Sequence, residues 1–205
     1  MTARQLAAND TRRRLFAAAV ALFADAGYHG TTVDAIAKRA GVAKGTFFVH
    51  FATKDAVVTE LVRGQTAAAR RARVAALADG PLAALRATTL ALGAEAGRSR
   101  ELSRAVLAAT LENPTVAQDA DTLFGLVLAD LTTDARAARP LDADTLAGGL
   151  MAAYLGAALH FTSSRTSPEM LEILTPLVDA LLRPPLALEP RHASSAKPVR
   201  PRRRS

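Results

Sequence analysis

The chain has 205 residues, is 50% hydrophobic and carries a formal net charge of +7. It contains no cysteine, which excludes disulfides, thiolate metal sites and cysteine nucleophiles. We find no signal-peptide pattern and no run of about eighteen uncharged apolar residues, so the sequence predicts a cytoplasmic protein without a membrane partner. A chain of this length forms one core or a small module joined to a larger one, and we expect two units.

The charge is distributed unevenly. Residues 1–63 hold nine Lys and Arg against five Asp and Glu, residues 64–182 hold ten against thirteen, and residues 183–205 hold seven against one. Basic ends favour a polyanionic partner, and nucleic acid is favoured over membrane because no basic amphipathic segment accompanies the charge. We expect 184–205 to be a disordered basic tail that either adds nonspecific phosphate contacts or serves only solubility.

Helical periodicity recurs along the chain and strand-like alternation is absent, so the sequence predicts an all-α fold. Gly27 and Gly41 are typical helix stops, while Thr31 or Thr32 and then Thr53 are suited to cap the helices that follow them. The expected helices span residues 10–26, 33–40, 43–48, 54–78, 81–97, 99–112, 115–138, 142–162 and 168–182.

Two short helical segments are joined by Ala40-Gly41-Val42, where glycine permits a sharp turn. Phe47 and Phe51 are expected to fill the space beneath the second segment. Six of the nine Phe and Tyr residues lie at or before Phe51, because a small unit needs large side chains to enclose a core. We interpret the unit as a helix-turn-helix whose second helix enters the major groove of DNA; the alternative is a coincidental helical hairpin.

The stretch GYHGTTVDAIAKRAGVAKGTFFVHFATKDAVV resembles the N-terminal DNA-binding segment of the TetR family of bacterial transcriptional regulators. It follows the family pattern TTV..IA..AGV..GT.Y.HF..K..L, and the resemblance covers about residues 10–60. Beyond them the chain follows only the family outline of a divergent helical domain that binds a small molecule and dimerises. The resemblance thus implies a three-helix DNA-binding domain over 1–53 and a larger ligand-binding and dimerisation domain over 54–183.

The resemblance also implies which residues contact DNA. Phe48 stands where the family usually has Tyr, so the ring packing is kept but the phosphate-binding hydroxyl is lost, which mainly weakens binding without changing sequence preference. The implied phosphate contacts are Thr31, Thr32, His50 and Lys54. The implied contacts of the recognition helix to bases or nearby backbone are Val42, Ala43, Lys44, Gly45 and Thr46, with glycine allowing close approach.

Small residues recur along one side of the predicted helix 142–162, and they let two helix backbones approach closely. The residues are Gly149, Ala152, Ala153, Gly156 and Ala157. They serve either a two-fold dimer contact or close packing within one subunit. Because the family dimerises through its last two helices, the resemblance favours a homodimer in which these residues meet Leu171, Leu174, Leu177 and Leu181.

A ligand pocket is harder to predict, because an aliphatic stripe marks ordinary core more often than a pocket wall. The scarcity of aromatic residues in the middle of the chain favours a small, mainly apolar ligand. The four histidines show no metal-ligand spacing, and no nucleophile elbow or phosphate loop occurs, so we predict no metal, cofactor or enzymatic activity. The candidate ligand-binding residues are Thr89, Arg104, Leu107, Thr110, Leu111, Phe124, Leu128, Tyr154, Leu155 and His160.

The sequence therefore predicts a homodimeric, TetR-like transcriptional repressor that binds a pseudo-palindromic, double-stranded operator and is released by a small ligand. One alternative is a ligand-independent DNA-binding protein whose helical domain only dimerises, which a filled interior would favour. The other alternative is an enzyme, which no motif supports.

Overall fold

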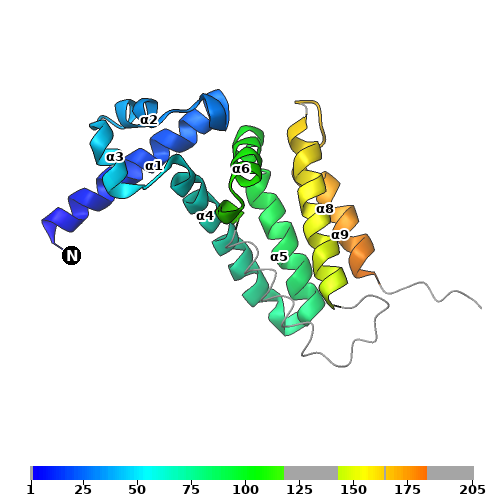
Figure 1. Cartoon of the computed structure of the whole chain (residues 1–205). Helices are drawn as coiled ribbons and strands as arrows, with labels where there is room; N and C mark the ends of the chain where they lie inside the picture. The colour runs from blue at the N-terminus through cyan, green and yellow to red at the C-terminus, as the bar shows by residue number, and fades with distance from the viewer. Residues whose placement is uncertain (1, 118–142, 164, 184–205) are drawn as a thin grey trace, which may run out of the picture.

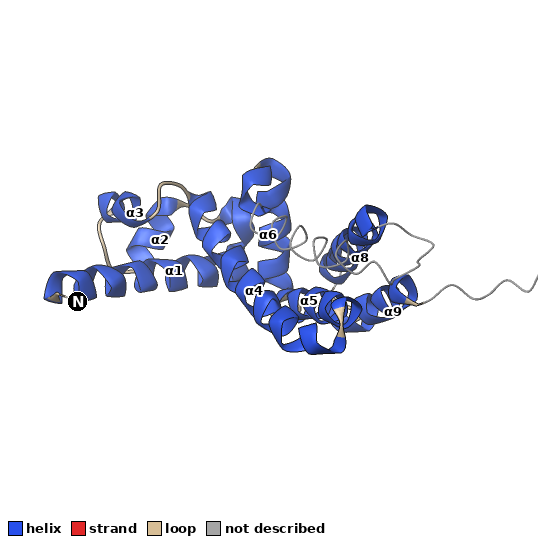
Figure 2. Cartoon of the chain, turned by 90° about the horizontal axis from the view of Figure 1, so that it is seen from below, coloured by secondary structure: helices blue, strands red, loops and turns tan. Residues whose placement is uncertain are grey.

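The computed structural model describes residues 2–117, 143–163 and 165–183. Every regular element in these ranges is helical, which confirms the predicted all-α class (Figures 1 and 2). The predicted helix 115–138 lies largely outside the described residues, and the tail 184–205 lies wholly outside them. The elements are α1 (Ala3–Gly30), α2 (Val33–Arg39), α3 (Lys44–His50), α4 (Lys54–Ala76), η1 (Leu77–Asp79), α5 (Pro81–Ala96), α6 (Arg100–Glu112), η2 (Pro114–Ala117), α8 (Ala143–Ser163) and α9 (Met170–Leu182).

Helix α1 extends beyond both predicted ends. It begins at Ala3 because Thr2 and Gln5 form a capping box, in which each side chain bonds the backbone of the other. Near its other end Gly27 adopts φ +72° and ψ 176°, a conformation that interrupts the helix where the sequence predicted a stop. The last turn therefore points away from the rest of α1.

The turn between α2 and α3 follows the predicted pattern. Thr32 caps α2, because its hydroxyl accepts a hydrogen bond from the amide of Ala35 at 3.1 Å. Gly41 adopts φ +68°, which lets the chain turn sharply into α3. Phe47 and Phe51 are both buried with ring centroids 5.7 Å apart. Their packing attaches the inner face of α3 to the first core.

Helix α4 belongs to both halves of the molecule (Figure 1). Val57, Val58 and Val62 join the first core, formed by α1 to α4 together with residues of α6 and η2. Further along α4, Ala69 joins the second core, which also contains residues of α5, α8 and α9. The division after residue 53 stays a prediction, since the first core continues well into α4.

The second core is held by close packing of α5 against α9. A side-chain carbon placed on Gly93 would lie 2.5 Å from Cδ2 of Leu174, so a larger residue there would have to displace the Leu174 side chain. Helix α6 connects the cores, because Ala105 and Ala109 pack in the first while Leu107 packs against the second. Both α4 and α6 therefore span the junction between the halves.

Helix α8 contains a long apolar stretch. The segment Asp144–Ser163 is long and apolar enough to cross a membrane by length and composition alone, a property that core helices of proteins without membrane spans share. In the structure α8 packs against α5, α6 and α9, with Leu150 and Phe161 buried. Only 39% of its most apolar window is buried, so a second apolar face remains exposed on the single subunit.

Candidate functional site

Helix α3 presents an exposed face at one end of the molecule, remote from α8 and α9 (Figure 1). Phe47 points inward and is completely buried, whereas Phe48 and Val49 are 51% and 78% exposed. Lys44 and Gly45 are also exposed. A side chain on Gly45 would meet no atom within 4 Å, so the space beside this residue is open in the free subunit.

The predicted DNA contacts cluster around α2, α3 and the start of α4, with one clear exception. Thr31 is only 2% exposed, and its hydroxyl donates a hydrogen bond to the carbonyl of Gly27 at 2.7 Å. Its side chain therefore stabilises the end of α1, which corrects its assignment as a surface contact. The other predicted residues are exposed (Thr32, Ala43, Lys44, Gly45 and Phe48) or half-buried (Val42, Thr46, His50 and Lys54), and DNA contact stays a prediction for them.

The two predicted lysine contacts have different surroundings. Lys44 forms an exposed ion pair with Asp34 at 2.8 Å, an interaction weak enough to exchange for a phosphate. Lys54 donates hydrogen bonds to the carbonyls of Tyr28 at 2.7 Å and Thr31 at 3.3 Å. Its ammonium also lies 3.9 Å from the centroid of the Tyr28 ring. Lys54 therefore ties the start of α4 to the end of α1.

Arg12 is a positioning residue that sequence reasoning missed. Its guanidinium donates to the carbonyl of His50 and to the carboxylate of Glu60, and it lies 4.2 Å from the centroid of the Phe51 ring. Arg12 thus links α1 to the end of α3 and to α4. The sequence showed only a cluster of arginines, and no local pattern separates Arg12 from Arg13 and Arg14.

Asp55 forms a second joint between distant segments. Its carboxylate accepts a hydrogen bond from the hydroxyl of Tyr28 and another, at 3.1 Å, from the side-chain amide of Asn113. Burial and the hydrogen bond to Asp55 raise the pKa of Tyr28 above its ordinary value, so the phenol stays neutral and remains a donor. We call these residues the Asp55 joint; it connects α1, α4 and the end of α6.

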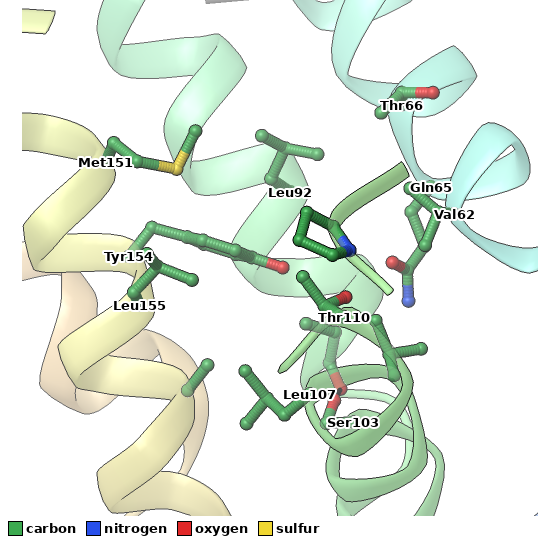
Figure 3. Close-up of a pocket in the computed structure, with 14 residues that line it drawn as sticks. Val62, Gln65, Thr66, Leu92, Ser103, Leu107, Thr110, Met151, Tyr154 and Leu155 are labelled. Atoms are coloured by element: carbon green, nitrogen blue, oxygen red, sulfur yellow. Dashed lines mark hydrogen bonds between the residues drawn. The ribbon is translucent and has the colours of Figure 1, made fainter. Parts of the chain in front are cut away.

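A cavity of about 260 Å³ lies among α4, α5, α6, η2 and α8 (Figure 3). Its wall is mostly apolar, and none of the lining residues carries a charge. The hydroxyls of Thr66 and Ser103 are bonded to the carbonyls of Arg63 and Ala96 at 3.0 and 2.5 Å. The lining residues are Val62, Gln65, Thr66, Leu92, Ala96, Ser103, Val106, Leu107, Thr110, Pro114, Met151, Tyr154, Leu155 and Ala158.

Tyr154 provides a polar group inside this apolar space. Its ring extends from α8 toward the middle of the cavity (Figure 3). Burial raises the pKa of Tyr154 to about 12, so the phenol is neutral at physiological pH and can donate a hydrogen bond. Gln65 and Thr110 are further polar lining residues on the opposite side.

The cavity contains only part of the predicted ligand site. Leu107, Thr110, Tyr154 and Leu155 line it. The remaining described candidates do not: Thr89 is buried and bonds the carbonyl of Leu85, Arg104 bonds the carbonyl of Thr162, Leu111 is 80% exposed, and His160 is exposed. Phe124 and Leu128 lie outside the described residues.

The contribution of α4 to the cavity was missed. Val62, Gln65 and Thr66 lie on a helix that the sequence assigned to the larger domain without any sign of a pocket. Their spacing places these three side chains on one face of the helix. Residues that only pack in a core have the same spacing, so the pattern does not distinguish a cavity wall from ordinary packing. No group of three or more His, Asp or Glu side chains that could hold a metal ion occurs in the described part of the chain.

The predicted stripe of small residues on α8 divides between two environments. Ala157 is fully buried, and a side-chain carbon on Gly149 would lie 3.5 Å from Leu181 of the same subunit. Ala152 and Gly156 are instead exposed. On α9, Leu174 is buried in the core, which corrects its assignment to a dimer contact, whereas Leu171 and Leu177 are 39% and 43% exposed.

The fold and the exposed second helix define an all-helical, helix-turn-helix protein with an attached cavity-bearing helical domain. Residues 15–61 match the family model for bacterial regulatory proteins of the tetR family. This match identifies the N-terminal segment as a helix-turn-helix of the tetR type.

Individual relatives agree with this assignment. The transcriptional repressor KstR2 of Mycobacterium tuberculosis is 45% identical over 56 residues, which cover 27% of this chain and 28% of that relative. The chain therefore matches little more than a quarter of the length of this curated relative.

Solved structures resemble most of the chain, and two of them illustrate the likeness. One is Thermus thermophilus FadR, a TetR-family repressor in complex with lauroyl-CoA, which has 26% identity and a TM-score of 0.65 over 88% of this chain and 97% of that one. The other is Bacillus subtilis FadR in complex with stearoyl-CoA, which has 15% identity and a TM-score of 0.66 over 83% and 97%. The second likeness establishes the fold alone.

We predict that Gly45→Ala separates stability from DNA binding. Alanine should raise the free energy of unfolding by up to about 1 kcal/mol, because glycine is the poorer helix former and the space beside it is open. The added methyl group should nevertheless weaken operator binding roughly tenfold or more, since a displaced base contact costs about 1–3 kcal/mol. Urea denaturation and fluorescence anisotropy measure the two effects.

Gly64→Ala is the matched control. Gly64 lies within α4, and a side-chain carbon there also meets nothing within 4 Å. This variant should gain similar stability and bind DNA like the wild type. Unchanged DNA binding by Gly45→Ala would show that no partner approaches α3 at this residue.

Proposed function

We propose that the protein is a homodimeric transcriptional repressor of the bacterial cytoplasm that binds operator DNA through α3 and releases it when a ligand enters the cavity. The observation that carries this proposal is the exposed face of α3 on a TetR-type helix-turn-helix, with open space at Gly45. The cavity supports ligand control and argues against the alternative in which the helical domain only dimerises.

Each subunit would insert α3 into the major groove of one half-site, so the two recognition helices would lie about 34–36 Å apart or near a multiple of that spacing. Thr32 and Lys44 would meet phosphate or base edges from exposed positions. We assign the remaining contacts to Val42, Ala43, Gly45, Thr46, Phe48, His50 and Lys54. Lys54 would act partly through the carbonyls it already binds, by fixing the first turn of α4.

The dimer would form through α8 and α9. Four leucines of these helices stay between 39% and 56% exposed on the single subunit, and exposed Ala152 and Gly156 would let two copies of α8 approach closely. This face is remote from α3, so dimerisation would leave both recognition helices accessible (Figure 1). The leucines are Leu155, Leu159, Leu171 and Leu177.

The ligand would be a molecule with an aliphatic chain and an uncharged polar group near it. The cavity wall is mainly apolar and uncharged, and Tyr154, Gln65 and Thr110 offer hydrogen bonds. Its volume of about 260 Å³ is slightly below the roughly 300–1,000 Å³ typical of drug-sized sites, so a short chain or part of a longer one would be buried. Because two structural relatives hold acyl-CoA molecules, we propose an acyl thioester, with its charged portion outside the cavity.

The signal would pass through the Asp55 joint. Thr110 and Pro114 line the cavity, and Asn113 between them binds Asp55 at the start of α4. A ligand that displaces the end of α6 would therefore shift α4 and, through Tyr28, the end of α1. The effect on operator affinity can be no larger than the difference in ligand affinity between the two conformations.

The first test is a titration of the full chain on DNA from its own upstream region. We expect tight binding that scrambled DNA does not displace, with two subunits per site by analytical ultracentrifugation. Raising the salt concentration should weaken binding steeply, because phosphate contacts release counterions. Equal affinity for specific and scrambled DNA, repeated for sequences selected from a random library, would refute the repressor proposal.

We predict that Leu107→Trp abolishes release by ligand but preserves operator binding, because the larger ring fills the cavity. Lauroyl-CoA is the first probe, and anisotropy on the labelled operator measures release. Leu111→Trp is the control: Leu111 lies on the same helix, is 80% exposed and does not line the cavity, so this variant should respond like the wild type. Equal responses of the two variants would place the ligand elsewhere.

We also predict that Asn113→Ala weakens the coupling between ligand and DNA. The variant should bind lauroyl-CoA normally by calorimetry, yet the ligand-induced loss of operator affinity, typically 5–150-fold for coupled sites, should become several-fold smaller. Arg86→Ala is the control, because it removes an exposed link between α5 and α9, the ion pair to Asp179. Unchanged coupling in Asn113→Ala would exclude the Asp55 joint as the path between the cavity and the operator.

Failure of lauroyl-CoA to bind the wild type would exclude this ligand class without affecting the operator result.

A further inference from the structure

Phe48 and Val49 form an exposed apolar pair on α3. Phe48 is 51% exposed, and its ring meets the buried Phe47 ring edge-on, with centroids 5.5 Å apart and planes at 86°. One side of the Phe48 ring is thereby anchored while the other faces outward. Val49 is 78% exposed, and valine in a helix strongly prefers one rotamer. Both side chains are therefore held in position before any partner arrives.

This exposure has no explanation within the proposed dimer. Single exposed apolar residues are common on protein surfaces, but Phe48 and Val49 adjoin each other and lie one turn from the open space at Gly45. The dimer face on α8 and α9 lies far from α3 (Figure 1). A second subunit bound there would leave the apolar pair uncovered.

The polar side chains of α3 offer few means to distinguish bases. The helix contains no Arg, Asn or Gln, the residues that bind guanine or adenine through two hydrogen bonds. Lys44 is exposed but paired with Asp34, while Thr46 and His50 are half-buried. The feature of the major groove that an apolar side chain recognises is the 5-methyl group of thymine.

We propose that Phe48 and Val49 contact thymine 5-methyl groups in each operator half-site and so determine part of the sequence specificity. This inference rests on the proposed function, because it requires α3 to enter the major groove. It extends that function by naming the chemical group recognised. The contact at Phe48 needs no hydroxyl, so the replacement of the usual family Tyr is compatible with sequence recognition.

The test uses the full chain and an operator selected from random DNA. Each thymine is replaced singly by deoxyuridine, which removes the methyl group and keeps the base pair. We expect about fourfold weaker binding for each contacted methyl group, and about fifteenfold when both half-sites are changed, from the free energy of burying one such group. At the same positions, the deoxyuridine–adenine pair is then replaced by a cytosine–guanine pair with or without a 5-methyl group on cytosine. The operator with 5-methylcytosine should bind more tightly than the operator with unmethylated cytosine.

Protein variants assign the effect to the apolar pair. Phe48→Ala and Val49→Ala should each lose sensitivity to deoxyuridine at particular positions, which a double-mutant cycle measures. Val74→Ala is the control, since Val74 is 64% exposed on α4 and should leave the sensitivity unchanged. Thermal unfolding checks that each variant is folded, as expected for exposed positions.

The outcomes separate the two proposals. Selective DNA binding that is indifferent to deoxyuridine at every thymine would overturn methyl recognition and leave the repressor function intact. Sensitivity that persists in both Phe48→Ala and Val49→Ala would assign the methyl contact to other residues and would also overturn this inference. Failure to select any DNA sequence would refute the repressor function and methyl recognition together.

Discussion

The carboxylate of Asp55 holds together the ends of three helices that come from distant parts of the chain. It accepts hydrogen bonds from Tyr28 at the end of α1 and from Asn113 just after α6, and it lies in the first turn of α4. A negative charge there also favours the helix dipole of α4. Through these bonds the end of α1 is joined to α4 and to the end of α6, two helices that also line the cavity.

Helices α4 and α6 each contribute residues to both cores, so a displacement of either helix would affect both halves of the molecule. Val58 of α4 and Ala109 of α6 pack in the first core, while Ala69 and Leu107 on the same helices pack in the second. The cavity lies between these shared helices, with Val62 on one side and Thr110 on the other. A molecule in the cavity would therefore contact helices that also extend into the first core.

The charged side chains around the helix-turn-helix are of two kinds: some bond to neighbouring helices and stabilise the unit, and others remain exposed on its surface. Arg12 and Lys54 bind carbonyls and lie over aromatic rings, so they hold α1, α3 and α4 in place. Lys44 has only a solvent-exposed partner and can exchange it. The apolar residues divide similarly, since Phe47 supports α3 from beneath while adjacent Phe48 faces outward. The proposed contact of α3 with thymine methyl groups is consistent with the small number of exposed polar side chains on this helix.

The sequence by itself determined the features whose causes are local. Gly27 and Gly41 interrupt helices because they adopt positive φ, and Thr32 and Thr53 cap helices through amides three residues later. The TetR pattern is also contiguous, so the helix-turn-helix could be predicted without knowledge of the rest.

The cavity and the joints required the tertiary structure. Leu107 and Leu111 are one turn apart on α6 and equivalent by periodicity, yet one lines the cavity and the other is 80% exposed. Periodicity defines a helix face but does not specify where neighbouring helices end. The side chains of Asp55 and Asn113 meet across 58 residues of sequence, and Lys54 bonds to the carbonyl of Tyr28 near the end of α1, 26 residues earlier. Only the packing of α1, α4 and α6 brings these groups within hydrogen-bonding distance, because such contacts depend on where whole helices lie and not on the residues beside them in the chain.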